Sequence, residues 1–176
     1  HKVHAPKGVG ALLVRRGTRI APLILGCGQQ CGLRSGTENT AGAVALGRTM
    51  QLLRDGQLGS FDELAALTDE LWRGLTARFP DARRNGAAPF LPNTLNVWFP
   101  GVSAVQLQAR LAERGASVAS AASVTTGAPS HVLTSMGLAR ERTTESVRIS
   151  LGFGMTRASI QRFLDVLGEC VPLVAG

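Results

Sequence analysis

The sequence predicts a globular protein of the α/β class, because strand and helix patterns alternate over most of its 176 residues. A hydrophobic content of 44% with 18% charged residues is typical of a folded domain rather than of a disordered chain. In the second half the order strand, helix, strand, loop, helix, strand, helix describes an α+β or α/β unit of about 85 residues.

The first elements surround a glycine-rich passage, LGCGQQCGLRSGTEN. Before it, the apolar segment VGALLV at 9–14 lies between turn residues and predicts a short buried strand. After it, Thr37 is expected to be a helix N-cap with Glu38 in the first turn, and the helix is expected to reach about Leu53.

A second helix is predicted from the pair Ser60 and Glu63, whose spacing is that of a capping box. Apolar residues at helical spacing follow, and Phe79 with Pro80 marks the expected end. One strand and two helices cannot easily close a core alone, so the first 80 residues are interpreted as one edge of a larger domain.

The later segments are taken in chain order. NTLNVWF predicts a strand, SAVQLQARLAERG a helix stopped by Gly115, and ASVAS another strand. A polar stretch from Ser120 to Ser130 predicts a loop, and HVLTSMGLA a short helix closing near Gly137. SVRISLG predicts a strand and TRASIQRFLDVLGECVPLV a final helix.

Composition limits the classes of partner. The formal charge is +7, but the basic residues are scattered and the chain has no tyrosine, so direct nucleic-acid binding is not expected. A solvated basic surface is the favoured interpretation and an acidic protein partner the alternative. No apolar run is long enough to cross a membrane and no secretory pattern opens the chain, which favours a cytoplasmic protein. Three cysteines fit a reducing compartment, and their spacing predicts no metal site.

Three side chains are candidates for chemistry. The amine of Lys2 is a possible nucleophile that forms a Schiff base with a carbonyl cofactor. Thr37 offers a hydroxyl at the start of a helix, where a phosphate is favoured, although an ordinary N-cap is the alternative. Arg148 lies between apolar neighbours in a strand and needs a carboxylate or carbonyl partner, either a ligand or a structural salt bridge.

Five ordered segments carry a resemblance. HKVHAPKGVGALLVRRG, GQQCGLRSGTENTAG, LPNTLNVWFPGV and APSHVLTSMGL followed by SVRISLG resemble the C-terminal half of the cysteine desulfurases. These are pyridoxal 5'-phosphate enzymes of fold type I, related to selenocysteine lyase. The resemblance implies the end of the large cofactor-binding domain at residues 1–85 and an α+β small domain at 86–176, with an active-site loop near 117–130.

The resemblance also implies roles for individual residues. Lys2 would be the Schiff-base lysine and a proton carrier, and His1 would lie beside the cofactor phosphate. Thr37 would reach the cofactor phosphate of a neighbouring subunit, which implies a homodimer. Arg148 would bind the carboxylate of the substrate, L-cysteine, and the sulfur would pass to an acceptor protein.

One position departs from the family pattern. Counting back from Pro129 places Ala122 where the family has the nucleophilic cysteine of a mobile loop. Three explanations stay open: an engineered substitution, a natural loss, or use of another cysteine such as Cys27 or Cys31. A methyl group cannot attack sulfur.

Two other functions therefore stand beside cysteine desulfuration. One is a selenocysteine lyase or a related C–S or C–Se lyase that does not need the cysteine. The other is a non-catalytic fragment or subunit that binds a sulfur-trafficking partner. The family's larger N-terminal part supplies the ring stacked on the cofactor and the aspartate that pairs with its pyridine nitrogen, so this chain alone is expected to be inactive.

Overall fold

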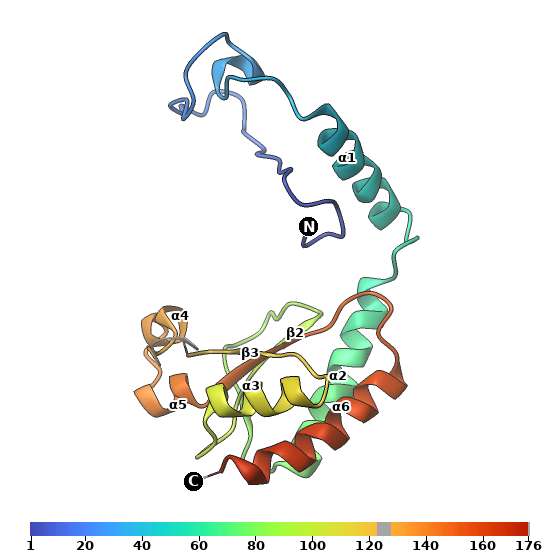
Figure 1. Ribbon diagram of the computed structural model, residues 1–176, viewed down its shortest axis with the longest axis vertical. Coiled ribbons are helices and arrows are strands. Elements are labelled where there is room, and N and C mark those ends of the chain that lie inside the picture. Colours follow the sequence, from blue (N-terminus) through green and yellow to red (C-terminus); the bar gives the residue numbers. More distant parts are fainter. Residues whose placement is uncertain (123–127, 176) are drawn as a thin grey trace. The chain divides into compact units, whose positions relative to one another are not determined.

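The computed structural model describes residues 1–122 and 128–175, which form two compact units, His1–Leu58 (unit 1) and Gly59–Gly176 (unit 2) (Figure 1). The elements of unit 1 are η1 (Gln30–Gly32) and α1 (Thr40–Arg54). The elements of unit 2 are, in chain order, α2 (Phe61–Arg78), β1 (Arg83–Arg84), β2 (Thr94–Trp98), α3 (Ala104–Glu113), β3 (Ala119–Ser120), α4 (His131–Ser135), α5 (Arg140–Thr144), β4 (Ser146–Ser150), α6 (Arg157–Cys170) and η2 (Val171–Leu173).

The strands of unit 2 form one antiparallel sheet in the order β1-β2-β4-β3. In the central pair, Leu95 lies opposite Ile149 and Val97 opposite Val147. All four of these side chains are buried, because alternate residues of a strand point to the same face of a sheet. This face carries the core, and the fold agrees with the predicted α/β class.

Helices cover that apolar face. Figure 1 shows α2, α3 and α6 on one side of the sheet, and their inward leucines belong to the same buried cluster as the strand residues. The fully buried leucines of this cluster are Leu71, Leu75, Leu95, Leu107, Leu111 and Leu167. The helices α2 and α3 are capped by Ser60 and Ser103, whose hydroxyls accept hydrogen bonds from backbone N–H groups of the first turn.

Most elements of unit 2 agree with the predictions from the sequence. The predicted elements include β2, α3, β3, α4, β4 and α6, and the predicted limits of α2 at Ser60 and Phe79 are its N-cap and C-cap. Two short elements were not predicted, β1 with two residues and α5 with five. Residues 123–127 of the predicted active-site loop lie outside the described residues.

The predicted strand at 9–14 is wrong. No residue of this segment pairs with a strand in unit 1, all of which the structure describes, and Leu12 and Leu13 are 77% and 97% exposed. A strand is stable only when its backbone groups find partners on a neighbouring strand. The segment is apolar as described, but unit 1 contains no sheet edge with which its backbone could pair.

The predicted N-cap at Thr37 is also wrong. The helix α1 begins at Thr40, and the Oδ1 of Asn39 accepts a hydrogen bond of 3.0 Å from the N–H of Gly42. Asparagine is at least as good an N-cap as threonine, and its position two residues later decides where the helix starts. Glu38 therefore precedes the helix instead of lying in its first turn.

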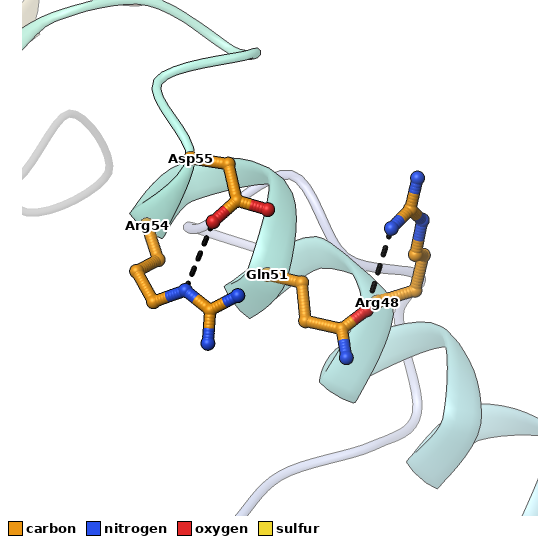
Figure 2. A network of polar contacts seen from close by, with 4 residues as sticks. All are labelled: Arg48, Gln51, Arg54 and Asp55. Atoms are coloured by element: carbon orange, nitrogen blue, oxygen red, sulfur yellow. Dashed lines mark hydrogen bonds and ion pairs between the residues drawn. The ribbon is translucent and has the colours of Figure 1, made fainter.

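The C-terminal half of α1 carries short-range polar contacts, shown in Figure 2. Arg48 donates to the Oε1 of Gln51 over 3.3 Å, and Arg54 pairs with Asp55 over 2.9 Å. Exposed pairs of this kind contribute little to the free energy of unfolding, so they do not determine where the helix forms.

The two compact units divide at Leu58, and α2 packs against α6 within unit 2. The assignment of 1–85 to a large domain and 86–176 to a small domain refers to the intact protein and stays a prediction.

The close crossing of α2 and α6 at Gly74 gives the first prediction. A Cβ at Gly74 would overlap the Cδ1 of buried Leu164, so Gly74→Ala is expected to destabilise the chain by about 1–3 kcal/mol. Gly168→Ala on α6 is the matched control. Its Cβ would lie 3.6 Å from the nearest Arg78 nitrogen, and the change is expected to stabilise by about 0.5–1 kcal/mol. Urea unfolding measures the stability change of each variant. Equal changes of the same sign would contradict a close contact of Gly74 with Leu164.

The ion pair between the same helices gives the second prediction. Arg78 donates a hydrogen bond of 2.5 Å to Asp165, and this bond lowers the pKa of the Asp165 carboxyl from its ordinary value of 3.8. A lowered pKa in the folded state means stability that is present above 3.8 and is lost as the pH falls through the lowered value. Asp165→Asn is thus expected to lower the urea midpoint slightly at pH 7. If the difference in urea midpoint between Asp165→Asn and the unchanged protein is as large at pH 3 as at pH 7, the ion pair is not its cause.

Candidate active site

Lys2 belongs to a turn at the start of unit 1. The N–H of His4 donates to the carbonyl of His1 over 3.0 Å, and His4 adopts a left-handed conformation with φ of 67°. His1 and Lys2 are exposed. Within the described part of the chain, Lys2 forms no hydrogen bond or ion pair, so its amine is available to an external group.

The loop before α1 is closed by backbone contacts. Ile24 and Arg34 form an isolated bridge, and the N–H of Ser35 donates to the carbonyl of Ile24 over 3.1 Å. At Gly26 a Cβ would lie only 2.8 Å from the Cβ of Ser35, so glycine allows the two segments to approach. This closure gives the RSGT motif a defined backbone.

Thr37 lies at the exposed end of this loop. A guanidinium nitrogen of Arg34 donates to the carbonyls of Gly36 and Thr37 over 3.3 and 3.4 Å. The hydroxyl of Thr37 has no hydrogen-bond partner among the described residues, which leaves it free to bind a ligand.

Asn39 connects the two segments of unit 1. Besides capping α1, its Nδ2 donates to the carbonyl of Gly8 over 3.3 Å. The chain that follows Lys2 is thereby tied to the residue that starts α1, two positions after Thr37.

Arg148 lies in unit 2, on the face of the sheet opposite the core. Its cross-strand neighbours are Asn96 on β2 and Ala119 on β3. The side chain is exposed, and it forms no hydrogen bond or ion pair with any of the residues the structure describes. The alternative of a structural salt bridge therefore has no support in residues 1–122 and 128–175.

Ala122 comes two residues after β3, the strand that flanks Arg148. The N–H of Ala121 donates to the carbonyl of Ser146 over 2.8 Å, and the hydroxyl of Ser120 donates to the carbonyl of Ala122 over 2.5 Å. Ala122 is 6% exposed. The position that would carry the nucleophile is thus adjacent to the sheet and holds only a methyl group.

The cysteines do not supply an obvious replacement. Cys27 and Cys31 are exposed free thiols of unit 1, whereas Cys170 is buried in α6. The guanidinium of Arg34, which could have activated a thiol in this loop, donates to backbone carbonyls instead.

A buried polar network near Arg148 was not found from the sequence. Asn85 is 5% exposed, and its side chain contacts Asn96, Arg142 and Ser146. Asn85 is followed by Gly86, a pair typical of an exposed turn, so the sequence does not indicate that Asn85 is buried. The alternation of TLNVW did place Asn96 on the polar face of its strand, and this was the available signal.

Arg84 ties β1 to the loop that follows it. Its Nη2 donates to the carbonyl of Thr94 over 3.1 Å, and its guanidinium lies 3.5 Å from the centroid of the Phe90 ring. Burial lowers the pKa of Arg84 from its ordinary value. These contacts indicate a structural role.

The described residues offer neither a cluster of metal ligands nor a membrane-spanning helix. None of their His, Cys, Asp and Glu side chains gather in a group of three that could hold a metal ion. None of the helices in this part of the chain is long and apolar enough to span a membrane.

The chain belongs to the aminotransferase class-V family, whose model matches residues 1–163. A cysteine desulfurase from Trichormus azollae is 40% identical over 174 residues, which are 97% of this chain and 44% of that protein. The solved structure of a NifS-like protein matches with a TM-score of 0.84 at 34% identity, covering 99% of this chain and 45% of its own. The predicted resemblance is confirmed, and the chain spans less than half the length of these relatives.

A further solved structure is of SspA in complex with cysteine. It matches with a TM-score of 0.65 at 31% identity and covers 89% of this chain and 43% of its own.

Proposed function

We propose that this chain is part of a pyridoxal 5'-phosphate-dependent cysteine desulfurase, which converts L-cysteine to L-alanine and passes the sulfur to an acceptor. The observation that carries the proposal is Arg148, an exposed guanidinium without a partner in the described chain, on the polar face of a folded sheet. The similarity to a cysteine desulfurase over 97% of the chain supports it, as does the cysteine complex of SspA.

The side chains of unit 1 fit the cofactor chemically. The amine of Lys2 has no internal partner and suits an aldehyde, and the hydroxyl of Thr37 has none and suits a phosphate. We assign Lys2 to hold the cofactor, His1 to lie beside its phosphate, and Thr37 to bind the phosphate in a neighbouring subunit of a homodimer. When bound, pyridoxal phosphate supplies an electron sink for bonds at the substrate α-carbon.

The residues of the chain would act on the substrate as follows. Arg148 binds the carboxylate through its two-pronged guanidinium and so orients the amino acid. Lys2 moves a proton at the α-carbon. A thiol then attacks the substrate sulfur: an S–S bond forms, the C–S bond breaks, and the carbon keeps the electron pair and takes a proton. The products are L-alanine and a persulfide.

Ala122 cannot supply that thiol, which favours a second candidate function. A lyase for selenocysteine or an activated thiol releases its leaving group without a protein nucleophile at this position. We propose this as the alternative if the Ala122 form is the natural one.

We further propose an acceptor protein for the sulfur and a cytoplasmic location. The exposed free thiols of Cys27 and Cys31 fit a reducing compartment, where such thiols persist.

The desulfurase proposal is tested with the full-length, cofactor-loaded dimer. Ala122→Cys is expected to release alanine and sulfide in equal amounts from L-cysteine when a reducing thiol is present, because the substitution restores the nucleophile. In this background, Lys2→Ala should abolish both products, and Arg148→Gln should raise KM by about 10- to 100-fold, since a hydrogen bond to a charged group is lost. If Ala122→Cys yields neither product in a loaded dimer, the proposal fails.

The lyase alternative predicts that the protein with Ala122 in place turns over selenocysteine. Alanine and selenide are measured with the same enzyme preparation in the presence of a reducing thiol, which supplies the two electrons that convert the released selenium to selenide. For activated thiol substrates, which lose their leaving group by β-elimination, pyruvate and ammonia are measured. The Lys2→Ala variant serves as the inactive control. Absence of turnover on both selenocysteine and activated thiol substrates would eliminate the alternative.

A further inference from the structure

The face of the sheet that carries Arg148 is mainly polar. The register of β2 and β4 places Asn96 opposite Arg148, with Thr94 opposite Ser150 and Trp98 opposite Ser146. Residues directly opposite each other in an antiparallel pair have side chains on the same face, close enough to share a ligand. Asn96 is thus a neighbour of Arg148.

The orientation of Asn96 follows from Arg142, because a guanidinium donates hydrogen bonds and cannot accept them. The Nε of Arg142 donates over 2.6 Å to Asn85, which must therefore present its Oδ1 there. The Nδ2 of Asn85 then faces the other way and donates to Asn96 over 2.7 Å and to the hydroxyl of Ser146 over 2.8 Å. Ser146 can accept because its own proton goes to the carbonyl of Arg142 over 2.6 Å.

Asn96 must consequently turn its Oδ1 toward Asn85, which leaves its Nδ2 as a donor. This Nδ2 has no hydrogen-bond partner among the described residues. It is not fully enclosed either, because the only buried side-chain nitrogen or oxygen without a partner in this part of the chain is the Nε of Arg84, and Asn96 itself is half-buried. A saturated buried network thus ends in one accessible amide donor.

We propose that Asn96 is a second donor to the substrate carboxylate, acting beside Arg148 and held in place by Asn85, Arg142 and Ser146. A carboxylate has two oxygens that only accept, which suits a guanidinium and an amide N–H on neighbouring strands. The inference rests on the proposed carboxylate role of Arg148. The Asn96 amide is already held by Asn85, whose own hydrogen bonds are all made. Asn96 therefore loses little conformational freedom when it binds the carboxylate.

The test uses binding rather than turnover. The full-length, cofactor-loaded protein with Ala122 in place is titrated with L-alanine and with ethylamine, the same amine without the carboxylate, and the absorbance of the bound cofactor reports Kd. Asn96→Asp keeps an acceptor for Asn85 but removes the donor, and Asn96→Leu removes the donor without adding charge. Both variants are expected to weaken L-alanine binding by about 10-fold or more and to leave ethylamine binding unchanged.

A matched control is Asn93→Asp, the same chemical change three residues earlier on the chain. The Nδ2 of Asn93 donates to the carbonyl of Leu151 over 3.0 Å, so this variant should lower the unfolding temperature without altering L-alanine affinity. Thermal unfolding of every variant is recorded beside its Kd.

Three results would overturn the inference. An equal loss of ethylamine binding would mean a structural role for Asn96. Weakening by Asn96→Asp alone would mean that the added charge acts on Arg148. If both Asn96 variants bind L-alanine unchanged while Arg148→Gln binds it much more weakly, Asn96 does not contact the carboxylate and the proposed function still stands. If Arg148→Gln itself binds L-alanine normally, the carboxylate role of Arg148 fails instead.

Discussion

The antiparallel pairing of β2 with β4 organises unit 2, because these two strands form the centre of the sheet. Its register sorts the side chains into two faces, one apolar and covered by α2, α3 and α6, the other polar and carrying Arg148. A shift of one residue would exchange the faces and expose the core. The same contact therefore fixes the hydrophobic interior and places the guanidinium that we assign to the substrate.

Unit 1 is built differently, with few buried side chains and many exposed apolar ones. The buried residues of unit 1 are Ala5, Ser35 and Thr49, whereas Leu12, Leu13, Leu23 and Leu25 are largely exposed. Its shape comes from local hydrogen bonds, such as those of Asn39 and Arg34, rather than from a core. The curated relatives are more than twice as long and offer further chain against which such apolar surfaces can pack.

Sequence reasoning succeeded where the local signal and the folded environment agree. The cap at Ser60 and the alternation in TLNVW act within a few residues, so they could be recognised. The strand at 9–14 failed because a strand depends on a partner that periodicity does not reveal. The polar network was missed because Asn85 and Ser146 are 61 positions apart and meet only after the sheet forms.

The pairing of Asn96 with Arg148 also has a consequence for how the chain folds during synthesis. Roughly fifty residues separate the two strands, so the centre of the sheet closes a long loop, and such non-local contacts form slowly. The ribosome must release β4 and α6 before the leucines of α2 and α3 can be buried against them. Until then those leucines are a natural target for chaperones.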